Sequence, residues 1–179
     1  LDEAIGGYAS TITVTLHNDG GTCTVQDNGR GIPVDKHPTQ KKSALEVILT
    51  TLHAGGKFKE GAYNTSGGLH GVGASVVNAL SAELEARVKR GGSEYRQQYK
   101  KGRPRNGVTQ VGPARGTGTA ITFRPDPTIF DHLSFEPDRI LEQLEVKSFL
   151  HKGLKIIFRD KLNKVTHELH HEGGIPDYL

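Results

Sequence analysis

Apolar residues alternate with polar ones along several short segments, the spacing that is typical of half-buried β-strands. The segment over 11–16 alternates threonine with aliphatic side chains, and the Asn-Asp-Gly-Gly turn at 18–21 leads into a second strand over 22–27. The same spacing predicts further strands over residues 84–90, 95–99, 119–123, 154–158 and 165–169. The pattern therefore favours hairpins of short strands over most of the chain.

Helical spacing accounts for most of the remaining segments. Residues 2–8 indicate the last turns of a helix that two glycines stop, and Ser43 stands three residues before Glu46, the spacing of a capping box. Further helices are expected over residues 74–80 and 136–150. Because strand pairs are interrupted by helices without regular βαβ units, we predict an α+β fold. It would be a two-layer sandwich, a mixed and mostly antiparallel sheet with helices on one face, in a single domain over 1–179.

The composition is that of an ordinary globular protein. Its 179 residues are 34% hydrophobic and 24% charged, with a formal net charge of +3 and a pI near 9.0. This excludes an intrinsically disordered chain, and no apolar run approaches the ~20 residues of a membrane helix. The lone cysteine, Cys23, suits a reducing compartment, so we expect a cytoplasmic protein without membrane association. The chain starts at Leu1 and has no methionine, which indicates a fragment of a longer protein.

Glycine is in clear excess, with 23 in the chain and a dense run over 54–73. The run fits neither standard phosphate-binding template. The Gly-Lys pair at 56–57 is followed by Phe rather than Ser or Thr, and no strand precedes the Gly-Val-Gly at 71–73. Backbone N–H groups of residues 67–73, which lead into a helix, could still hold an anion, with Lys57 supplying charge. A flexible surface loop is the alternative.

Asp27 closes the second strand and shares a face with Cys23 and Val25, which places a carboxylate in line with apolar side chains. A buried carboxylate needs hydrogen-bond donors, and the exocyclic amine of adenine is such a donor, directly or through water. Thr119, on the apolar face of a later strand, could assist. The alternative is an exposed aspartate that opens a turn, which is common. Periodicity leaves both interpretations open.

Two other motifs suggest different chemistry. Residues 167–171 match the His-Glu-x-x-His zinc pattern, but positions four apart on a strand lie roughly 13 Å apart, too far for one metal ion. The alternation around His167 and His171 favours a strand, so a zinc peptidase is disfavoured. Lys100 to Arg105 is a basic loop that could contact DNA, although solvated loops carry such charges more often. A DNA-binding module is therefore a second class of function that stays open.

Three longer motifs occur in order: Asp-Asn-Gly-Arg-Gly-Ile-Pro at 27–33, Leu-His-Ala-Gly-Gly-Lys-Phe at 52–58 and Ser-Gly-Gly-Leu-His-Gly-Val-Gly at 66–73. Together they resemble the ATPase domains of bacterial type II topoisomerases. The match to the gyrase B subunit is close, and the B subunit of topoisomerase IV shares most of these motifs. The resemblance extends from Leu1 to Gly174 and so covers essentially the whole chain. It implies the Bergerat ATP-binding fold, which sensor histidine kinases and ninety-kilodalton heat-shock chaperones share.

The resemblance implies a role for each motif. Asp27 would accept the adenine amine, with Thr119 and Gly31 completing that pocket and Tyr63 lying near the adenine. Residues 54–67 would form the ATP lid. The phosphate loop and its neighbours would be Gly56, Lys57, Gly68, Leu69, His70, Gly71, Val72, Gly73 and Ala74. Aminocoumarin inhibitors, which compete with ATP, would contact Glu3, Asp27, Arg30, Gly31, Ile32, Pro33, Ile48, Arg90 and Thr119.

The resemblance also implies partners and a limit to activity. The family's catalytic motif ends at Asp2-Glu3, so its general-base Glu and Mg²⁺-ligating Asn would lie upstream of Leu1, and the transducer and C-terminal domains beyond Leu179. We therefore expect no catalytic or metal residue in the chain, and a monomeric fragment that binds ATP without hydrolysing it. The parent enzyme would use ATP and Mg²⁺ to supercoil DNA with the gyrase A subunit, its B subunits dimerising on ATP binding.

Overall fold

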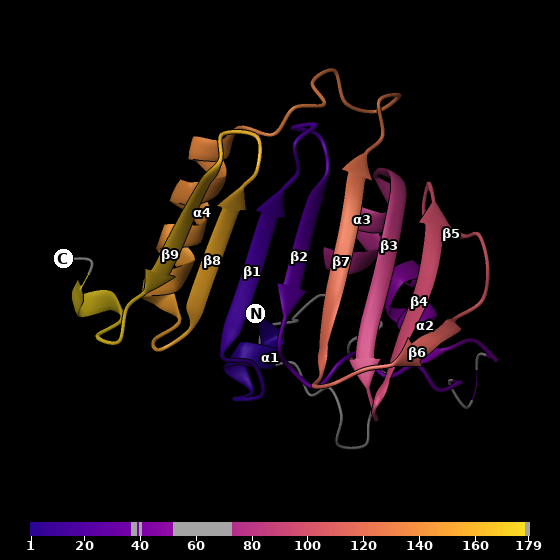
Figure 1. Cartoon of the computed structure of the whole chain (residues 1–179). Helices are drawn as coiled ribbons and strands as arrows, with labels where there is room; N and C mark the ends of the chain where they lie inside the picture. The colour runs from indigo at the N-terminus through magenta and orange to yellow at the C-terminus, as the bar shows by residue number, and fades with distance from the viewer. Residues whose placement is uncertain (37–38, 40, 52–72, 178–179) are drawn as a thin grey trace.

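A computed structural model describes residues 1–36, 39, 41–51 and 73–177 of the chain. Within these residues nine strands form one sheet (Figure 1). The strands are β1 Thr11–Leu16, β2 Cys23–Asp27, β3 Ser81–Arg90, β4 Ser93–Lys100, β5 Arg103–Pro104, β6 Thr109–Pro113, β7 Gly118–Pro125, β8 Lys155–Asp160 and β9 Val165–His170. The helices are α1 Asp2–Ile5, α2 Ala44–Thr50, α3 Gly73–Ala79 and α4 Pro137–Leu150, with a 3₁₀ turn, η2 Ile175–Asp177.

The sheet is mixed and mostly antiparallel, which confirms the prediction. Its strands follow the order β5-β4-β3-β7-β2-β1-β8-β9, and β6 pairs with β4. β1 runs parallel to β8, with Ile12 opposite Ile156, whereas the other named pairs are antiparallel. The parallel pair is possible because a long connection that contains α4 separates β7 from β8.

The helices lie on one face of the sheet, behind it in the view of Figure 1. Leu16 of β1 and Phe158 of β8 belong to a buried cluster against which Leu144 of α4 packs. Leu45 of α2 belongs to a second cluster, which includes Tyr99 of β4. β1, β3 and β8 each contribute alternate residues to these clusters, so the other residues of these strands face away from the helices. The two-layer prediction is confirmed.

The helix cap at Ser43 forms as the sequence predicts. Ser43 Oγ accepts the backbone N–H of Glu46 at 3.1 Å, at the first turn of α2. The Glu46 carboxylate accepts a hydrogen bond from Gln97 Nε2 of β4 at 2.9 Å, instead of completing the reciprocal bond of a capping box. The first turn of α2 is therefore also tied to the sheet.

Two strands were not predicted: β5 lies within the basic segment that was expected to be a loop, and no element was assigned to the residues of β6. β5 is two residues long, and nearly all of β6 is exposed, so neither has an alternating apolar pattern. Residues 167–170 of the zinc-like pattern lie in strand β9, as predicted, and His171 follows the strand. No helix in the described part of the chain is long and apolar enough to cross a membrane.

Candidate functional site

Asp27 is the last residue of β2, opposite Ile12 of β1, and lies at one end of the sheet. Its Oδ1 accepts two backbone N–H groups, from Gly29 at 2.9 Å and from Thr119 at 3.3 Å. Burial raises the pKa of the Asp27 carboxyl, and these two hydrogen bonds partly offset the rise. Among the described residues, the second oxygen, Oδ2, has no hydrogen-bond partner. The site thus presents a half-buried acceptor that can take a donor from a ligand.

Thr119 lies beside Asp27 because β7 pairs with β2. The Thr119 side chain is buried, and its Oγ1 accepts the backbone N–H of Ile32 at 3.0 Å. A hydroxyl that accepts one bond keeps its own proton to donate, and none of the described residues takes that proton. Asp27 and Thr119 therefore supply one acceptor and one donor at the same end of the sheet.

Two glycines allow the backbone to close around these side chains. Gly118 has a φ of 153°, and a Cβ there would overlap the carbonyl oxygen of Asp27. Gly31 has a φ of 82°, and a Cβ there would lie 2.6 Å from the carbonyl oxygen of Lys89. The Gly31 carbonyl itself accepts a hydrogen bond from Arg90 Nη1 at 2.8 Å. Both positions need the absence of a side chain so that β2, β3 and β7 can approach the loop that follows Asp27, residues 28–33, which we name the exit loop.

Contacts between Glu3 of α1 and Arg30 hold α1 against the exit loop. Glu3 Oε1 lies 2.8 Å from Arg30 Nη2, and Oε2 accepts the backbone N–H of Arg30 at 2.7 Å and its Nε at 3.3 Å. Burial by itself would raise the pKa of Glu3, but the bonds and the charge of Arg30 outweigh it and hold the pKa below its usual value. The Arg30 guanidinium also lies 3.6 Å from the centre of the Tyr8 ring. These contacts fix the loop that follows Asp27.

Asn28 ties the same loop to the start of β1. Its Oδ1 accepts the backbone N–H groups of Ser10 at 2.9 Å and Thr11 at 3.0 Å, and its Nδ2 donates to Ser10 Oγ at 2.9 Å. Sequence reasoning named no role for Asn28. Its only local signal is its position in a strand-to-turn junction, where asparagine commonly bonds to nearby backbone.

The structure brings together part of the predicted set. Ile32 packs against the cluster that contains Leu45 and Leu49 of α2, Pro33 follows it in the exit loop, and Ile48 is half-buried on α2. Gly73 and Ala74 begin α3 and are exposed. The remaining predicted positions lie outside the described residues: Gly56, Lys57, Tyr63, Gly68, Leu69, His70, Gly71 and Val72. The ligand roles of all these residues stay predictions.

The described residues do not present a metal centre. They contain no group of three or more His, Cys, Asp and Glu side chains close enough to share an ion. His167 and His171 instead lie against aromatic rings, with ring centres 6.2 Å from Phe158 and 3.6 Å from Phe149. The zinc peptidase geometry is therefore absent from the part of the chain that is described.

Residues 1–129 match the family of histidine kinase-, DNA gyrase B- and HSP90-like ATPases. The chain belongs to this family. Within it the chain is similar to the B subunits of DNA gyrase: it is 51% identical over 179 residues to that of Thermotoga maritima and 49% identical over 180 residues to that of Thermus thermophilus. It is also 45% identical over 187 residues to the B subunit of DNA topoisomerase 4 from Rickettsia bellii.

These alignments cover 99% or 100% of the chain but only 28% of each relative, so the relatives are much longer. Among solved structures, the 43K ATPase domain of Thermus thermophilus gyrase B in complex with an aminocoumarin superposes with a TM-score of 0.86 at 40% identity. That match covers 99% of the chain and 44% of the solved chain. The shared fold is therefore established over nearly all of the chain.

Proposed function

We propose that the chain is the ATP-binding domain of a bacterial DNA gyrase B protein, and that the adenine amine of ATP donates to Oδ2 of Asp27. The single observation that carries this proposal is the half-buried carboxylate, whose other oxygen is already bonded to Gly29 and Thr119. A carboxylate oxygen accepts hydrogen bonds, and the exocyclic amine of adenine is a suitable donor to an oxygen that is open to a ligand. The hydroxyl of Thr119 can donate to a ring nitrogen or to a bridging water beside it.

The phosphates would lie against the glycine-rich segment ending at Gly73, in the way the family resemblance implies. The described residues offer no donor set for Mg²⁺, so no step through that ion is assigned to them. We expect the 179 residues alone to bind nucleotide without turnover, because the base and Mg²⁺ ligand that the resemblance implies are not among them. Phosphate release by the pure chain that depends on Mg²⁺ would contradict this.

In the parent enzyme, ATP binding and hydrolysis would drive DNA supercoiling in the cytoplasm together with the gyrase A protein. Two copies of the gyrase B protein would dimerise when ATP binds. The relative solved with an aminocoumarin supports the further proposal that this drug class competes for the same pocket here, against Arg30, Ile32 and Arg90. Arg90 is held in place by its bond to the Gly31 carbonyl.

Calorimetric titration with novobiocin, an aminocoumarin, tests the site directly on the 179-residue chain. Losing one hydrogen bond to a charged acceptor costs about 1.5–3 kcal/mol, so Asp27→Ala should bind roughly 10- to 150-fold more weakly. Asp131→Ala, an exposed aspartate, is the matched control and should bind like wild type. A folded wild-type chain that does not bind would refute the pocket, and equal binding by Asp27→Ala would refute the role of Asp27.

Topoisomerase IV is the second candidate for the parent enzyme, because a relative of that name matches the chain along its full length. The two candidate parent enzymes are distinguished by the change that they make to DNA rather than by their nucleotide sites. If the parent is gyrase, the full-length protein with its A partner should introduce negative supercoils into relaxed plasmid in an ATP-dependent reaction. Decatenation without supercoiling would favour topoisomerase IV instead.

A further inference from the structure

One long stretch of the chain carries only positive charge. Residues 95–125 contain seven lysines and arginines and no aspartate or glutamate, although the whole chain carries 23 basic and 20 acidic residues. These seven are Arg96, Lys100, Lys101, Arg103, Arg105, Arg115 and Arg124. The stretch covers most of β4 together with β5, β6 and β7, so the charge is concentrated in the half of the sheet that ends at the β5 edge.

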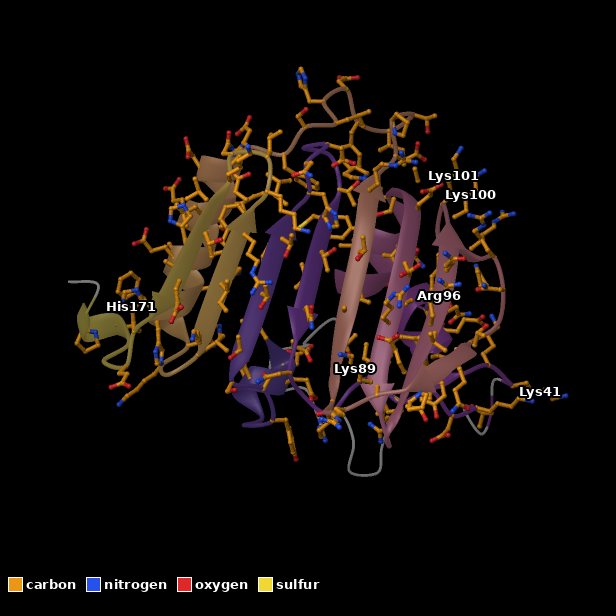
Figure 2. The ribbon with its side chains drawn as sticks, viewed as in Figure 1. Lys41, Lys89, Arg96, Lys100, Lys101 and His171 are labelled. Atoms are coloured by element: carbon orange, nitrogen blue, oxygen red, sulfur yellow. The ribbon has the colours of Figure 1, made fainter. Side chains whose placement is uncertain are left out.

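The connection between β4 and β5 gathers four of these cations. Lys101 and Gly102 have φ values of 49° and 80°, a tight turn that sets Lys100 directly opposite Arg103. The backbone N–H of Arg105 donates to the carbonyl of Gln98 at 2.8 Å, so pairing continues for one more residue. We name Lys100, Lys101, Arg103 and Arg105 the basic hairpin; Figure 2 shows Lys100 and Lys101 at its tip.

Strand alternation turns the basic hairpin toward solvent. Gln97 and Tyr99 are buried on the helix side of β4, so Lys100 and its partner Arg103 face the opposite, polar side of the sheet. All four residues of the basic hairpin are exposed. Their charges therefore lie on one accessible surface at the end of a two-stranded ribbon.

The acidic residues nearest to the basic hairpin already have partners. Glu83, opposite Lys100 on β3, pairs with Arg124 at 3.4 Å, and Glu85 pairs with Arg87 at 2.7 Å. Hydrogen bonds from Thr128 lower the pKa of Asp126, and the charge of Lys101 lowers it further. Among the described residues, no member of the basic hairpin has a carboxylate within 4.0 Å.

The fold itself does not need this charge. Like charges directly opposite each other on paired strands destabilise the pairing, and Lys100 and Arg103 are such a pair. Basic residues do protect exposed strand edges from aggregation, but β5 has an edge of only two residues, one of them Pro104. Among the described residues, four cations without an ion pair gather at this short edge, and this points to an anionic partner.

We propose that the basic hairpin binds the phosphate backbone of duplex DNA. The choice of DNA as the polyanion rests on the proposed function, whereas the binding surface itself rests on the charges and contacts of the hairpin. Extended, exposed lysine and arginine side chains make sequence-independent phosphate contacts. The hairpin tip lies at the opposite end of the sheet from Asp27, since β4 ends where β2 begins, as Figure 1 shows. DNA and nucleotide therefore bind without sharing a residue.

Fluorescence anisotropy with a labelled duplex of about 30 base pairs tests the proposal on the 179-residue chain. Four phosphate contacts predict that affinity falls about a hundredfold between roughly 50 and 200 mM salt. Replacing the basic hairpin by Lys100→Gln, Lys101→Gln, Arg103→Gln and Arg105→Gln should abolish most of that binding and flatten its salt dependence. The matched control replaces by Gln four exposed lysines near the opposite edge of the sheet, the one that β8 and β9 form. These lysines are Lys147, Lys152, Lys161 and Lys164.

Both quadruple variants have the same net charge. The control therefore distinguishes DNA binding at the basic hairpin from attraction of DNA to the net positive charge of the whole chain. Equal weakening by the two variants, or wild-type affinity in the hairpin variant, overturns the proposal. Novobiocin titration of the hairpin variant checks its fold independently. If that variant fails to fold, the single changes Lys100→Gln and Arg103→Gln decide: each should lower the salt slope by about one unit, and unchanged slopes overturn the proposal. DNA binding by a chain that does not bind novobiocin would uphold this inference and refute the nucleotide pocket.

Discussion

Replacing Glu3 by Gln tests how the nucleotide end of the sheet is held together. Glu3 is 8% exposed, and its carboxylate receives three hydrogen bonds from Arg30, one of them part of an ion pair at 2.8 Å. Glutamine keeps the size of the side chain and one acceptor oxygen. It places an amide NH₂ group against the donors of Arg30, so the ion pair and at least one hydrogen bond are lost.

The expected cost follows from burial and from the chemistry of these bonds. An exposed ion pair is worth about 0–1 kcal/mol, whereas hydrogen bonds to charged groups in partly buried sites are worth about 1.5–3 kcal/mol. Arg30 keeps its contact with the Tyr8 ring, which limits the loss. We expect Glu3→Gln to lower the free energy of unfolding by about 2 kcal/mol, equivalent to roughly 4–8 °C in Tm for a chain of this length.

The pH dependence separates charge from packing. Because the pKa of Glu3 is lowered in the folded state, its stabilisation is fully present above the unfolded pKa, near 4.5, and is lost as pH falls through the folded pKa. Urea unfolding of wild type and Glu3→Gln should therefore differ most at about pH 6–7, and the difference should shrink as the pH falls below 4.5 and through the folded pKa. Glu142→Gln, at an exposed position of α4, is the control and should change stability by less than about 0.5 kcal/mol. A gap of constant size at every pH would show that the carboxylate charge is not the cause.

Three further substitutions test other parts of the structure. In urea unfolding at about pH 7, Asp27→Asn should be as stable as wild type or more stable, because burial raises the pKa of Asp27 and so penalises its ionised form. This advantage should vanish at low pH, where Asp27 is protonated. The same variant should bind novobiocin at least roughly 10-fold more weakly. Gly118→Ala should lower the free energy of unfolding by about 2–4 kcal/mol, since its Cβ would overlap the Asp27 carbonyl, whereas Gly112→Ala, with open space around it, should be nearly neutral. Ser43→Ala should cost about 1 kcal/mol by loss of the α2 cap, and Ser43→Asp should restore most of it; equal stability of the three proteins would show that the cap is unimportant.

The fold could be predicted from the sequence wherever one side of an element is buried. Alternation in β1 and β8 and the helical period of α4 each reflect a core side and a solvent side, so periodicity marks them. β6 carries no such signal because it borders β4 alone and is almost wholly exposed. Its pairing rests on backbone hydrogen bonds, which every residue except proline can donate, so the side chains do not encode it.

The candidate site also combines features that strand periodicity predicts with contacts that it does not predict. Strand alternation places Asp27 and Thr119 on the apolar sides of their strands but leaves open whether Asp27 is exposed; in the folded chain Asp27 is half-buried and Thr119 is buried. The pairing of Glu3 with Arg30 joins residues 27 positions apart, and the bond of Arg90 to the Gly31 carbonyl joins residues 59 apart. No local pattern specifies such contacts. They follow only from the way the sheet brings α1, the exit loop and β3 to one place.

The glycines show how one compositional signal can have two physical sources. The sequence pattern draws attention to the segment ending at Gly73, as a loop for phosphates. In the described structure Gly29, Gly31 and Gly118 serve a different purpose, because a Cβ at each would strike the Glu3 side chain, the Lys89 carbonyl or the Asp27 carbonyl. Burial raises the pKa of the Asp27 carboxyl, whereas the backbone N–H groups of Gly29 and Thr119 partly offset that rise and hold its Oδ1, which leaves Oδ2 for a ligand. Adding a methyl group at Gly118 should therefore weaken ligand binding even in molecules that remain folded.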